Sequence, residues 1–305
     1  MVDICICVCT CQRGELLKTC LASLAAVSVQ GFQLSVLIVD NDADRSAESL
    51  VNGFNESFPF PLRYVCEAKR GIPCARNRAV EDVLQQGSDY LVFIDDDEWV
   101  EPDWLLKLFQ LCQENSGEVV VSGGVMSELP TETPPEIRAL FNKRLNSHAR
   151  GKRLESCATN NVLVPMAAIK QHSLRFDESR PLAGGTDVIF FKEATAKGVR
   201  ILKCPDALVH EIIPVSRTRL GWLSKRKYRA GITEAWRKKK NGRAVFGIFV
   251  SALFQIVVLC CKAGVSALFG RKVARNQSWL KACRALGVAA GVFGVEVDSY
   301  RQIDG

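Results

Sequence analysis

The sequence lacks the paired cysteine spacing of a structural zinc site. It holds 13 cysteines, but no two of them are separated by just two residues. Cys5, Cys7, Cys9 and Cys11 alternate along one stretch. Alternation places them in an extended row on one face of a strand, and such a row does not wrap around a tetrahedral ion. We therefore expect small, buried, free thiols in a reducing compartment, and no zinc site.

The sequence also lacks a secretory leader at its start. Asp3 and the cysteine-rich stretch after it do not form a basic segment followed by an apolar one. We therefore expect the protein to begin folding in the cytoplasm.

What the sequence does contain is a short apolar run that leads straight into four carboxylates. Residues 90–94 are apolar, and Asp95, Asp96, Asp97 and Glu98 follow directly. Such a run predicts a strand that is buried on both faces. Four adjacent carboxylates repel one another unless a cation lies among them, and ligands of open α/β sheets collect at the carboxyl ends of strands. The pattern favours a divalent metal that carries a phosphorylated ligand over an acidic surface turn.

Apolar runs and amphipathic stretches alternate along the first 200 residues, which predicts parallel α/β units. Strands are expected at 2–9, 34–39, 62–66, 90–94, 119–124 and 199–202. Helices are expected at 15–29 and 101–112, another opens within the basic stretch 69–79 and runs to about Gln86, and a further one begins near Asp187 after a Gly-Gly turn. Asn160 and Asn161 bind sugar hydroxyls or satisfy local backbone groups, and the sequence leaves both alternatives open.

The C-terminal third is strongly basic. Residues 206–305 hold 18 Lys or Arg against 6 Asp or Glu, a net charge of +12, whereas the remainder carries −5. The acidic part suits a metal site, and the basic part suits an anionic membrane surface or nucleic acid. No nucleic-acid-binding motif occurs, so we expect the membrane surface and no nucleic acid.

A long apolar run lies within this basic part. Residues 244–261 carry no charge, which reaches the length of a spanning helix, but basic residues flank the run on both sides. A spanning helix, a re-entrant hairpin and an interfacial helix therefore remain open, beside a buried core helix. We predict a catalytic domain over 1–213, a basic aromatic juxtamembrane segment over 214–243 and a hydrophobic helical membrane-associated tail over 244–305.

The ordered motifs resemble the family 2 glycosyltransferases, inverting enzymes with the GT-A fold. They are most similar to bacterial members of the succinoglycan type, which add glucose to lipid-linked exopolysaccharide repeats. An Asp-x-Asp pair alone is a weak signal, but the ordered set over about residues 3–230 is specific. The motifs that carry the resemblance are residues 8–13, 38–41, 75–77, 93–97, 185–187 and His210.

The resemblance implies a role for each matching residue. It implies that Asp187 is the catalytic base, and that Asp97 binds Mg²⁺ or Mn²⁺ with His210 as a further metal contact. The sequence departs from the family at two positions, because Cys11 replaces a usual proline and Thr186 replaces a usual acidic residue. The nucleotide-sugar contacts that the resemblance implies are Thr10, Arg13, Asp40, Arg76 and Asp95.

The same resemblance implies the architecture and the activity. The expected fold is α/β, a mostly parallel mixed sheet flanked by helices. The expected reaction moves a hexose, with glucose implied by the resemblance, from a UDP-sugar to a glycan or a polyprenyl-diphosphate-linked saccharide. The expected place is the inner (cytoplasmic) membrane, with the catalytic domain in the cytoplasm. A nucleotidyltransferase that makes nucleotide-sugars remains an alternative. A catalytically inactive sugar-binding protein is disfavoured by the intact Asp95, Asp97 and Asp187.

Overall fold

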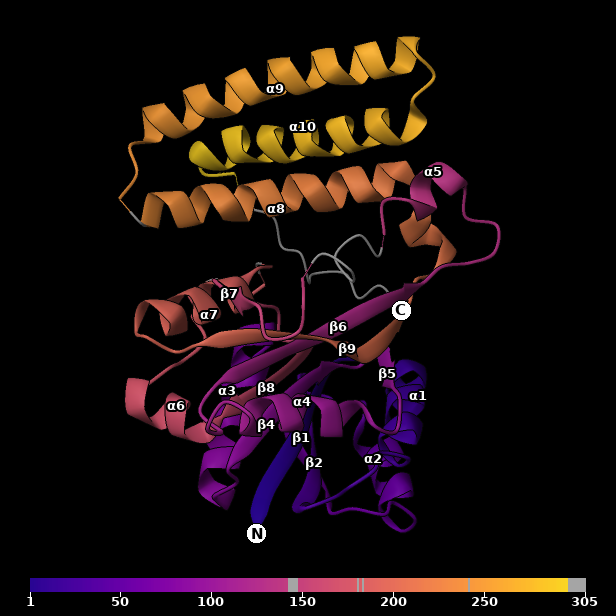
Figure 1. Cartoon of the computed structure of the whole chain (residues 1–305), viewed down its shortest axis with the longest axis vertical. Helices are drawn as coiled ribbons and strands as arrows, with labels where there is room; N and C mark the ends of the chain where they lie inside the picture. Colours follow the sequence, from indigo (N-terminus) through magenta and orange to yellow (C-terminus); the bar gives the residue numbers. More distant parts are fainter. Residues whose placement is uncertain (142–147, 180, 183, 241, 296–305) are drawn as a thin grey trace.

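The computed structural model describes residues 1–141, 148–179, 181–182, 184–240 and 242–295, so the last ten residues of the predicted tail lie outside the described part. A nine-stranded mixed sheet with helices on both faces forms the lower body of the molecule. Three long helices lie side by side above it (Figure 1). The α/β architecture with a mostly parallel first half confirms the predicted fold class.

Four strands form the parallel half of the sheet. They are β1 (Val2–Thr10), β2 (Phe32–Asp40), β3 (Leu62–Cys66) and β4 (Tyr90–Asp95), in the order β3-β2-β1-β4. The apolar runs of β1, β2 and β4 are buried on both faces, as expected for strands covered by helices on each side, whereas only Leu62 of the edge strand β3 is buried. Because the strands are parallel, their carboxyl ends meet at one edge, where the acidic turn after β4 lies.

The other half of the sheet is mixed. β8 (Asn161–Pro165) is antiparallel to β4 and to β6 (Val120–Glu128), and β9 (Ile201–Ile212) is parallel to β6. β5 (Glu98–Val100) and β7 (Arg153–Leu154) pair with β9 in the antiparallel sense. The long β9 therefore brings its last residues beside the acidic turn that joins β4 to β5.

Two hydrophobic cores cover the two faces of the sheet. On one face, α1 (Gly14–Leu24), α2 (Glu48–Asn55) and α4 (Trp104–Gln113) pack against the sheet. On the other face, α3 (Ile72–Gln86) packs beside two further helices, α6 (Met166–His172) and α7 (Thr186–Ala196).

The side chains of β1 show the alternation directly. Ile4 and Ile6 enter the first core, whereas Cys5 and Cys7 enter the second. Cys5 and Cys7 are buried and free, and Cys9 farther along the strand is half-buried. The predicted row of small thiols is thus the surface on which α3 packs.

Several predicted boundaries were wrong. α1 ends at Leu24 rather than at residue 29, and the backbone N–H of Ser28 instead donates to the carbonyl of Pro102. α4 begins at Trp104, after Pro102 rather than around it. α2 and β5 were not predicted, because α2 buries only Val51 and β5 exists through pairing with a distant strand.

The helical layer consists of α8 (Leu220–Lys240), α9 (Val245–Leu268) and α10 (Lys272–Val292), with α10 between the other two (Figure 1). A Cβ atom built on Gly231 would lie 2.0 Å from the Arg284 carbonyl oxygen, and one on Gly287 would lie 2.0 Å from that of Tyr228. Only glycine permits this approach of α8 to α10. Much of the basic segment 214–243 is therefore a helix that packs closely on the tail.

The short helix α5 (Pro135–Arg138), which follows β6 of the sheet, packs against the helical layer. Its Ile137 side chain packs against Leu223 of α8 and Leu280 of α10 in a small buried cluster. The helical layer thus has its own contacts with the polypeptide that leaves β6.

Candidate functional site

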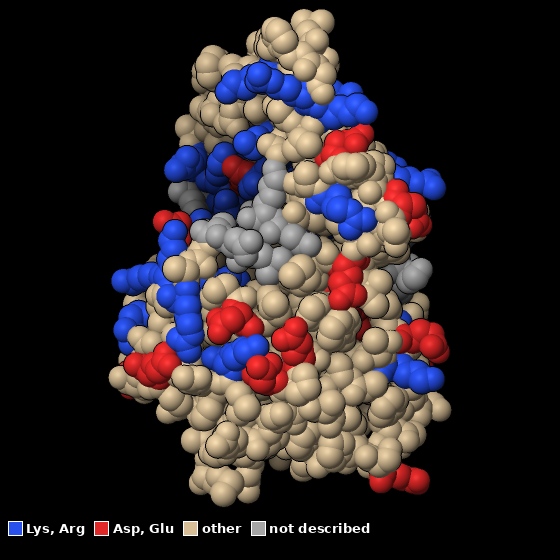
Figure 2. Space-filling view, turned by 45° about the vertical axis from the view of Figure 1, so that its right-hand side comes forward, with Lys and Arg blue, Asp and Glu red and all other residues tan. Residues whose placement is uncertain are grey.

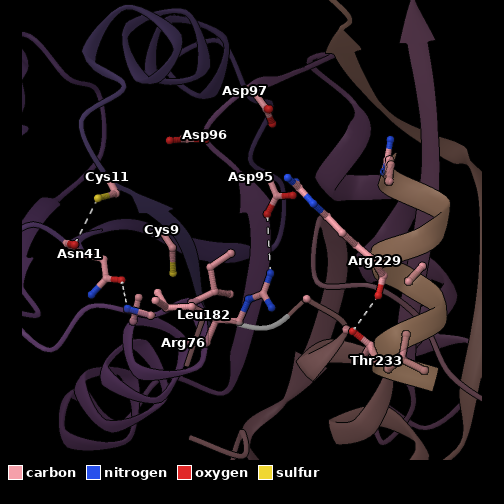
Figure 3. A pocket seen from close by; sticks show the side chains of 18 of the residues that line it. Cys9, Cys11, Asn41, Arg76, Asp95, Asp96, Asp97, Leu182, Arg229 and Thr233 are labelled. Carbon is pink, nitrogen blue, oxygen red and sulfur yellow. Dashed lines mark hydrogen bonds and ion pairs between the residues drawn. The ribbon is translucent and has the colours of Figure 1, made fainter. Parts of the chain in front are cut away.

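A cavity of about 820 Å³ lies at the carboxyl ends of the parallel strands, beneath α8. The acidic turn after β4 lines one side, and one face of α8 lines the other (Figure 3). The loop that leads into α7 contributes Leu182, Gly184 and Gly185. The volume is that of a typical small-molecule site.

Asp96 fixes the conformation of the acidic turn. Its Oδ2 accepts a hydrogen bond from Thr10 Oγ1 at 2.8 Å, and its Oδ1 lies 3.0 Å from Arg13 Nη1. Burial raises the pKa of Asp96, and the charge of Arg13 opposes that rise. Thr10 and Arg13 line the cavity, and their contact with a nucleotide-sugar stays a prediction. Thr10 and Arg13 also anchor Asp96, which lies between Asp95 and Asp97, the two carboxylates to which the resemblance assigns roles.

Asp97 lies between two guanidinium groups. Its Oδ2 is 3.5 Å from Arg13 Nη1 and 3.5 Å from Arg217 Nη1. Arg217 belongs to the short 3-10 helix η1 (Val215–Thr218), which connects β9 to the helical layer. Burial, followed by the charge of Asp97, raises the pKa of the neighbouring Glu211 carboxyl, which also lines the cavity.

Asp95 faces Arg76 across the cavity floor, with 4.0 Å between Oδ1 and Nη2. The Arg76 guanidinium also lies over the Phe176 ring, 5.7 Å from its centroid. Burial raises the pKa of Asp95, Arg76 opposes the rise, and Asp97 adds to it. The charge of Asp187 acts on Asp95 in the same direction as Asp97. The predicted Arg76 and Asp95 are therefore brought together.

Glu98, Asn160 and Asn161 form hydrogen bonds beneath the acidic turn. Glu98 is buried, and its Oε2 accepts the Asp95 backbone N–H at 3.1 Å. Its Oε1 accepts Asn160 Nδ2 at 3.0 Å. Asn161 is buried as well, with its amide hydrogen-bonded to Trp104, Gly124 and Ala207. Asn161 thus satisfies backbone carbonyls, whereas the half-buried Asn160 bonds a carboxylate and its predicted alternatives stay open.

The carboxylates of this turn fit a divalent cation that is shared with a ligand. Burial raises the pKa values of Asp95, Asp96 and Glu98, and neighbouring carboxylates add to each rise, so this acidic cluster favours a nearby positive charge. Within the described ranges, no three His, Cys, Asp or Glu side chains form a ready-made metal cluster. Mg²⁺ commonly takes one or two carboxylates and completes its shell with phosphate oxygens and water.

His210 lies elsewhere than the resemblance implied. Its ring stacks on Trp99 with 3.9 Å between centroids, and its Nδ1 and Nε2 lie 3.0 Å from Glu128 and 3.3 Å from Glu101. It does not line the cavity, whereas the next residue, Glu211, does. Successive strand residues point to opposite faces. The placement therefore does not support a metal contact for His210 and brings Glu211 toward Asp97 instead.

Asp40 is buried beneath the cavity, and the adjacent Asn41 lines it. Asp40 Oδ2 accepts the Ala47 backbone N–H at 2.8 Å and the Tyr64 hydroxyl at 3.0 Å. Its Oδ1 has no hydrogen-bond partner in the described part of the chain. Burial raises the pKa of Asp40. Because Asp40 is buried and does not line the cavity, its predicted role toward a base stays a prediction.

Asp187 is the second residue of α7, after a turn in which Gly185 has φ +87°. Its Oδ1 accepts the Val188 backbone N–H at 2.8 Å. Gly185 and Val188 line the cavity, whereas Asp187 is not among the lining residues, although its charge acts on Asp95. The acidic residues Asp177 and Glu178, which precede this loop, are engaged by Lys240 and Lys69.

The sequence did not single out the basic face of α8 as part of this site. The α8 side chains that line the cavity recur at helical spacing, and Arg217 precedes them. The helical spacing of these basic residues could have indicated that they face one site. A basic stripe next to an apolar run also suits a membrane surface, which is the interpretation that the sequence alone favours. The cavity-lining members are Trp222, Lys225, Arg226, Arg229, Ala230, Thr233, Glu234 and Arg237.

Comparisons with known proteins point to the same family that the sequence motifs resemble. The family model described as glycosyl transferase family 2 matches residues 5–174. The succinoglycan biosynthesis protein ExoM of Rhizobium meliloti (strain 1021) is 33% identical over 296 residues, covering 96% of this chain and 94% of that protein.

Solved structures share the fold. S. aureus TarS 1–349 has a TM-score of 0.54 at 13% identity, covering 95% of this chain and 90% of that one. GalNAc-T7 with UDP, GalNAc and Mn²⁺ has a TM-score of 0.58 at 10% identity, covering 77% of this chain and 51% of that one.

Proposed function

Because the chain belongs to glycosyltransferase family 2 and has the GT-A fold, we propose that it transfers a hexose, glucose in the first instance, from a UDP-sugar to a glycan or polyprenyl-diphosphate-linked acceptor in bacterial surface polysaccharide synthesis. Family membership decides against the nucleotidyltransferase alternative. One observation carries the proposal. A single cavity has the Asp95–Asp97 turn on one side and the loop into Asp187 on another.

The donor half of the proposal rests on the acidic turn. Asp97 would hold Mg²⁺ or Mn²⁺, with Glu211 nearby, and the ion would act as a Lewis acid on the leaving diphosphate when bound. Arg76 and Arg13 would contact the nucleotide-sugar, because guanidinium groups favour phosphate oxygens. The predicted contact of Asp40 with a nucleobase would require the lining residues above it to move, because Asp40 is buried and does not line the cavity. GalNAc-T7, which was solved with UDP and Mn²⁺, supports this donor chemistry by analogy.

The acceptor half of the proposal rests on Asp187. As a carboxylate near the N-terminus of α7, it lies where the helix dipole favours the ionised form. It would take the proton from the acceptor hydroxyl while that oxygen attacks the anomeric carbon from the face opposite the leaving diphosphate. One such displacement inverts the anomeric configuration without an enzyme nucleophile.

The proposed place is the cytoplasmic face of the inner membrane. Among the described helices, α9 alone is long and apolar enough to cross a membrane, with a mean hydropathy of 2.2 and 11% of its apolar window buried. Phe246, Phe254 and Leu268 are 78%, 70% and 86% exposed. Figure 2 shows the uncharged surface at the top of the molecule, where α9 lies, above a band of Lys and Arg side chains.

The packing of α9 favours a helix that lies in the membrane plane. α10 runs alongside α9 and carries Arg275, Lys281 and Arg284. If α9 crossed the bilayer in this packing, α10 would enter the bilayer with it. Each charged side chain near the bilayer centre would then cost about 2.5–3.5 kcal/mol of free energy or more. An interfacial helix keeps these charges at the headgroups.

Radiolabelled UDP-sugars and a lipid extract of the source bacterium test the proposed function. We expect label to move from UDP-glucose to the lipid fraction with release of UDP, in a reaction that requires a divalent cation. The absence of transfer from every UDP-sugar offered would contradict the proposal.

A further inference from the structure

We infer that the face of α8 that lines the cavity is a second anion subsite, which holds the diphosphate of the acceptor while the metal-bound UDP-sugar occupies the first. This inference rests on the proposed function and names the chemistry of its acceptor. We call Lys225, Arg226, Arg229 and Arg237 the α8 basic stripe; these residues line the cavity at helical spacing.

The charge of the cavity exceeds what one metal-bound donor needs. Nine Lys or Arg residues line it, against five Asp or Glu. The diphosphate of a UDP-sugar carries two negative charges, and a divalent cation bound to it cancels them. The excess of positive charge therefore stays in place when donor and metal are bound, and a second anion would balance it.

No close ion pair neutralises the α8 basic stripe within the described residues, although the charge of Arg226 acts on the Glu211 carboxyl. In the part of the chain that the structure describes, no carboxylate lies within 4.0 Å of the charged groups of Lys225, Arg226, Arg229 or Arg237. Basic residues elsewhere on α8 do have such partners, because Lys238 pairs with Glu234 at 2.8 Å and Lys240 pairs with Asp177. The opposite face of α8 is fixed against α10 by close contacts at Gly231. The stripe is thus held in place facing the cavity.

The stripe borders the acceptor side of the reaction. A Cβ atom built on Gly185 would lie 3.1 Å from Thr233 Cγ2, so α8 touches the turn that carries Asp187. Arg229 and Arg237 lie one helical turn before and after Thr233, and the Arg229 side chain extends across the cavity toward Asp95 (Figure 3). A base must stand beside the acceptor hydroxyl, so an anion held by these arginines would lie next to the place proposed for the acceptor.

Geranyl diphosphate is a suitable probe, because it carries the diphosphate and a prenyl group without a long lipid tail. Calorimetry would measure its binding to the full chain with saturating UDP and excess MgCl₂, so that the probe neither occupies the donor site nor depletes the metal. We expect wild-type protein to bind it beside UDP, and to bind geraniol, which lacks the diphosphate, more weakly.

The double variant Arg229→Ala/Arg237→Ala should lower the affinity for geranyl diphosphate by at least about 10-fold, because each arginine can supply charged hydrogen bonds to phosphate. Its affinity for UDP with Mg²⁺ should not change. Arg219→Ala is the matched control, because Arg219 is exposed, lies just before α8 and is outside the cavity lining. Melting temperatures would show whether the double variant folds, and Arg229→Lys, which keeps the charge, should retain most of the binding.

Three results would overturn the inference. Geranyl diphosphate could fail to bind wild-type protein that binds UDP, it could bind the double variant as tightly as wild type, or the double variant could lose UDP affinity in parallel, which would place the arginines in the donor site. Wild-type protein that does not bind UDP with Mg²⁺ would instead contradict the proposed function itself.

Discussion

Arg217 Nη1 lies 3.5 Å from Asp97 Oδ2, so the segment that leads into the helical layer contacts the carboxylate proposed to hold the metal. Arg13 reaches the same oxygen from the turn after β1 at an equal distance. Parts of the chain more than 200 residues apart thus meet at one carboxylate. The segment that enters the helical layer is therefore part of the site, beside the membrane role that we propose for that layer.

The first prediction concerns this carboxylate. Asp97→Asn should lower the metal-dependent part of the UDP affinity by at least about 10-fold, because a neutral amide is a poor ligand for a hard cation. Calorimetric titration of UDP with and without Mn²⁺ would measure it. Asp103→Asn is the control, since Asp103 pairs with Lys107 on the surface. An unchanged metal dependence in Asp97→Asn would remove Asp97 from the metal site.

The second prediction concerns the base. Asp187→Asn should lower turnover by about 10²-fold or more, since an amide cannot take a proton, while UDP-sugar binding changes little. The N-cap of α7 is Gly185, so the substitution leaves the cap intact and the melting temperature should hold. Initial rates at saturating donor and acceptor would measure the effect.

Asp177→Asn is the matched control for the base. Its hydrogen bond from Lys240 lowers the pKa of Asp177 to about 2, which makes that carboxylate a weak base. This variant should keep most of the transfer activity. A large loss in Asp177→Asn together with near-normal transfer by Asp187→Asn would show that our account assigns the base to the wrong loop position.

Much of the fold follows from the sequence, because the apolar runs that become most of β1 and all but the last residue of β4 are short and continuous. Such runs indicate buried strands from local composition alone. β5 and the single long β9 depend on distant pairing and on a register shift between Gly123 and Gly124. No local pattern predicts such contacts.

The candidate site likewise has a part that the sequence predicts and a part that depends on the folded structure. The residues of the acidic turn are contiguous in sequence, so their proximity was predictable. Thr10 ends β1, Arg13 follows it, and Arg76 follows β3 of the same parallel set. His210 and Glu211 are adjacent, and a difference of one residue along a strand decides which of them faces the cavity. The direction of the α8 basic stripe is set by glycine contacts with α10, which form only in the folded protein.

The third prediction concerns stability at acid pH. Glu178 Oε2 lies 2.6 Å from Lys69 Nζ, Glu178 Oε1 lies 2.6 Å from Asn77 Nδ2, and hydrogen bonds from these two groups lower the pKa of Glu178 from 4.5 to about 2. A depressed folded pKa stabilises the protein above pH 4.5, and this contribution is lost as the pH falls toward about 2.

Glu178→Gln should therefore lower the free energy of unfolding by about 1 kcal/mol at pH 7, a figure reduced for solvent screening of the exposed Lys69. The difference between wild type and variant should shrink as the pH falls through this window. Urea unfolding at a series of pH values would measure it. Glu132→Gln, on the surface, is the control. A difference that stayed constant with pH would refute the electrostatic origin.

The fourth prediction concerns α9. The triple variant Phe246→Ser/Phe254→Ser/Leu268→Ser should bind anionic vesicles more weakly, because these exposed side chains supply the apolar area that would enter the headgroup region. Stability should change little, since the side chains pack against few protein groups. Vesicle flotation would measure binding, with Val29→Ser, an exposed apolar position on the catalytic part, as the control.

Alkaline carbonate extraction distinguishes the two membrane arrangements of α9. A helix that lies in the membrane plane should be released from bacterial membranes, whereas a spanning helix should remain in the pellet. Full-length protein that stays in solution after lysis without detergent would argue against any membrane attachment.

The most direct test of the central claim is the fate of doubly labelled UDP-glucose, with one label in the sugar and one in the uracil, mixed with purified protein, Mn²⁺ and the lipid extract. Our account predicts that the sugar label enters the lipid fraction while the uracil label is released as UDP in equal amount, and that Asp187→Asn prevents both. UDP release without sugar in the lipid fraction, or equal transfer by wild type and Asp187→Asn, would contradict it.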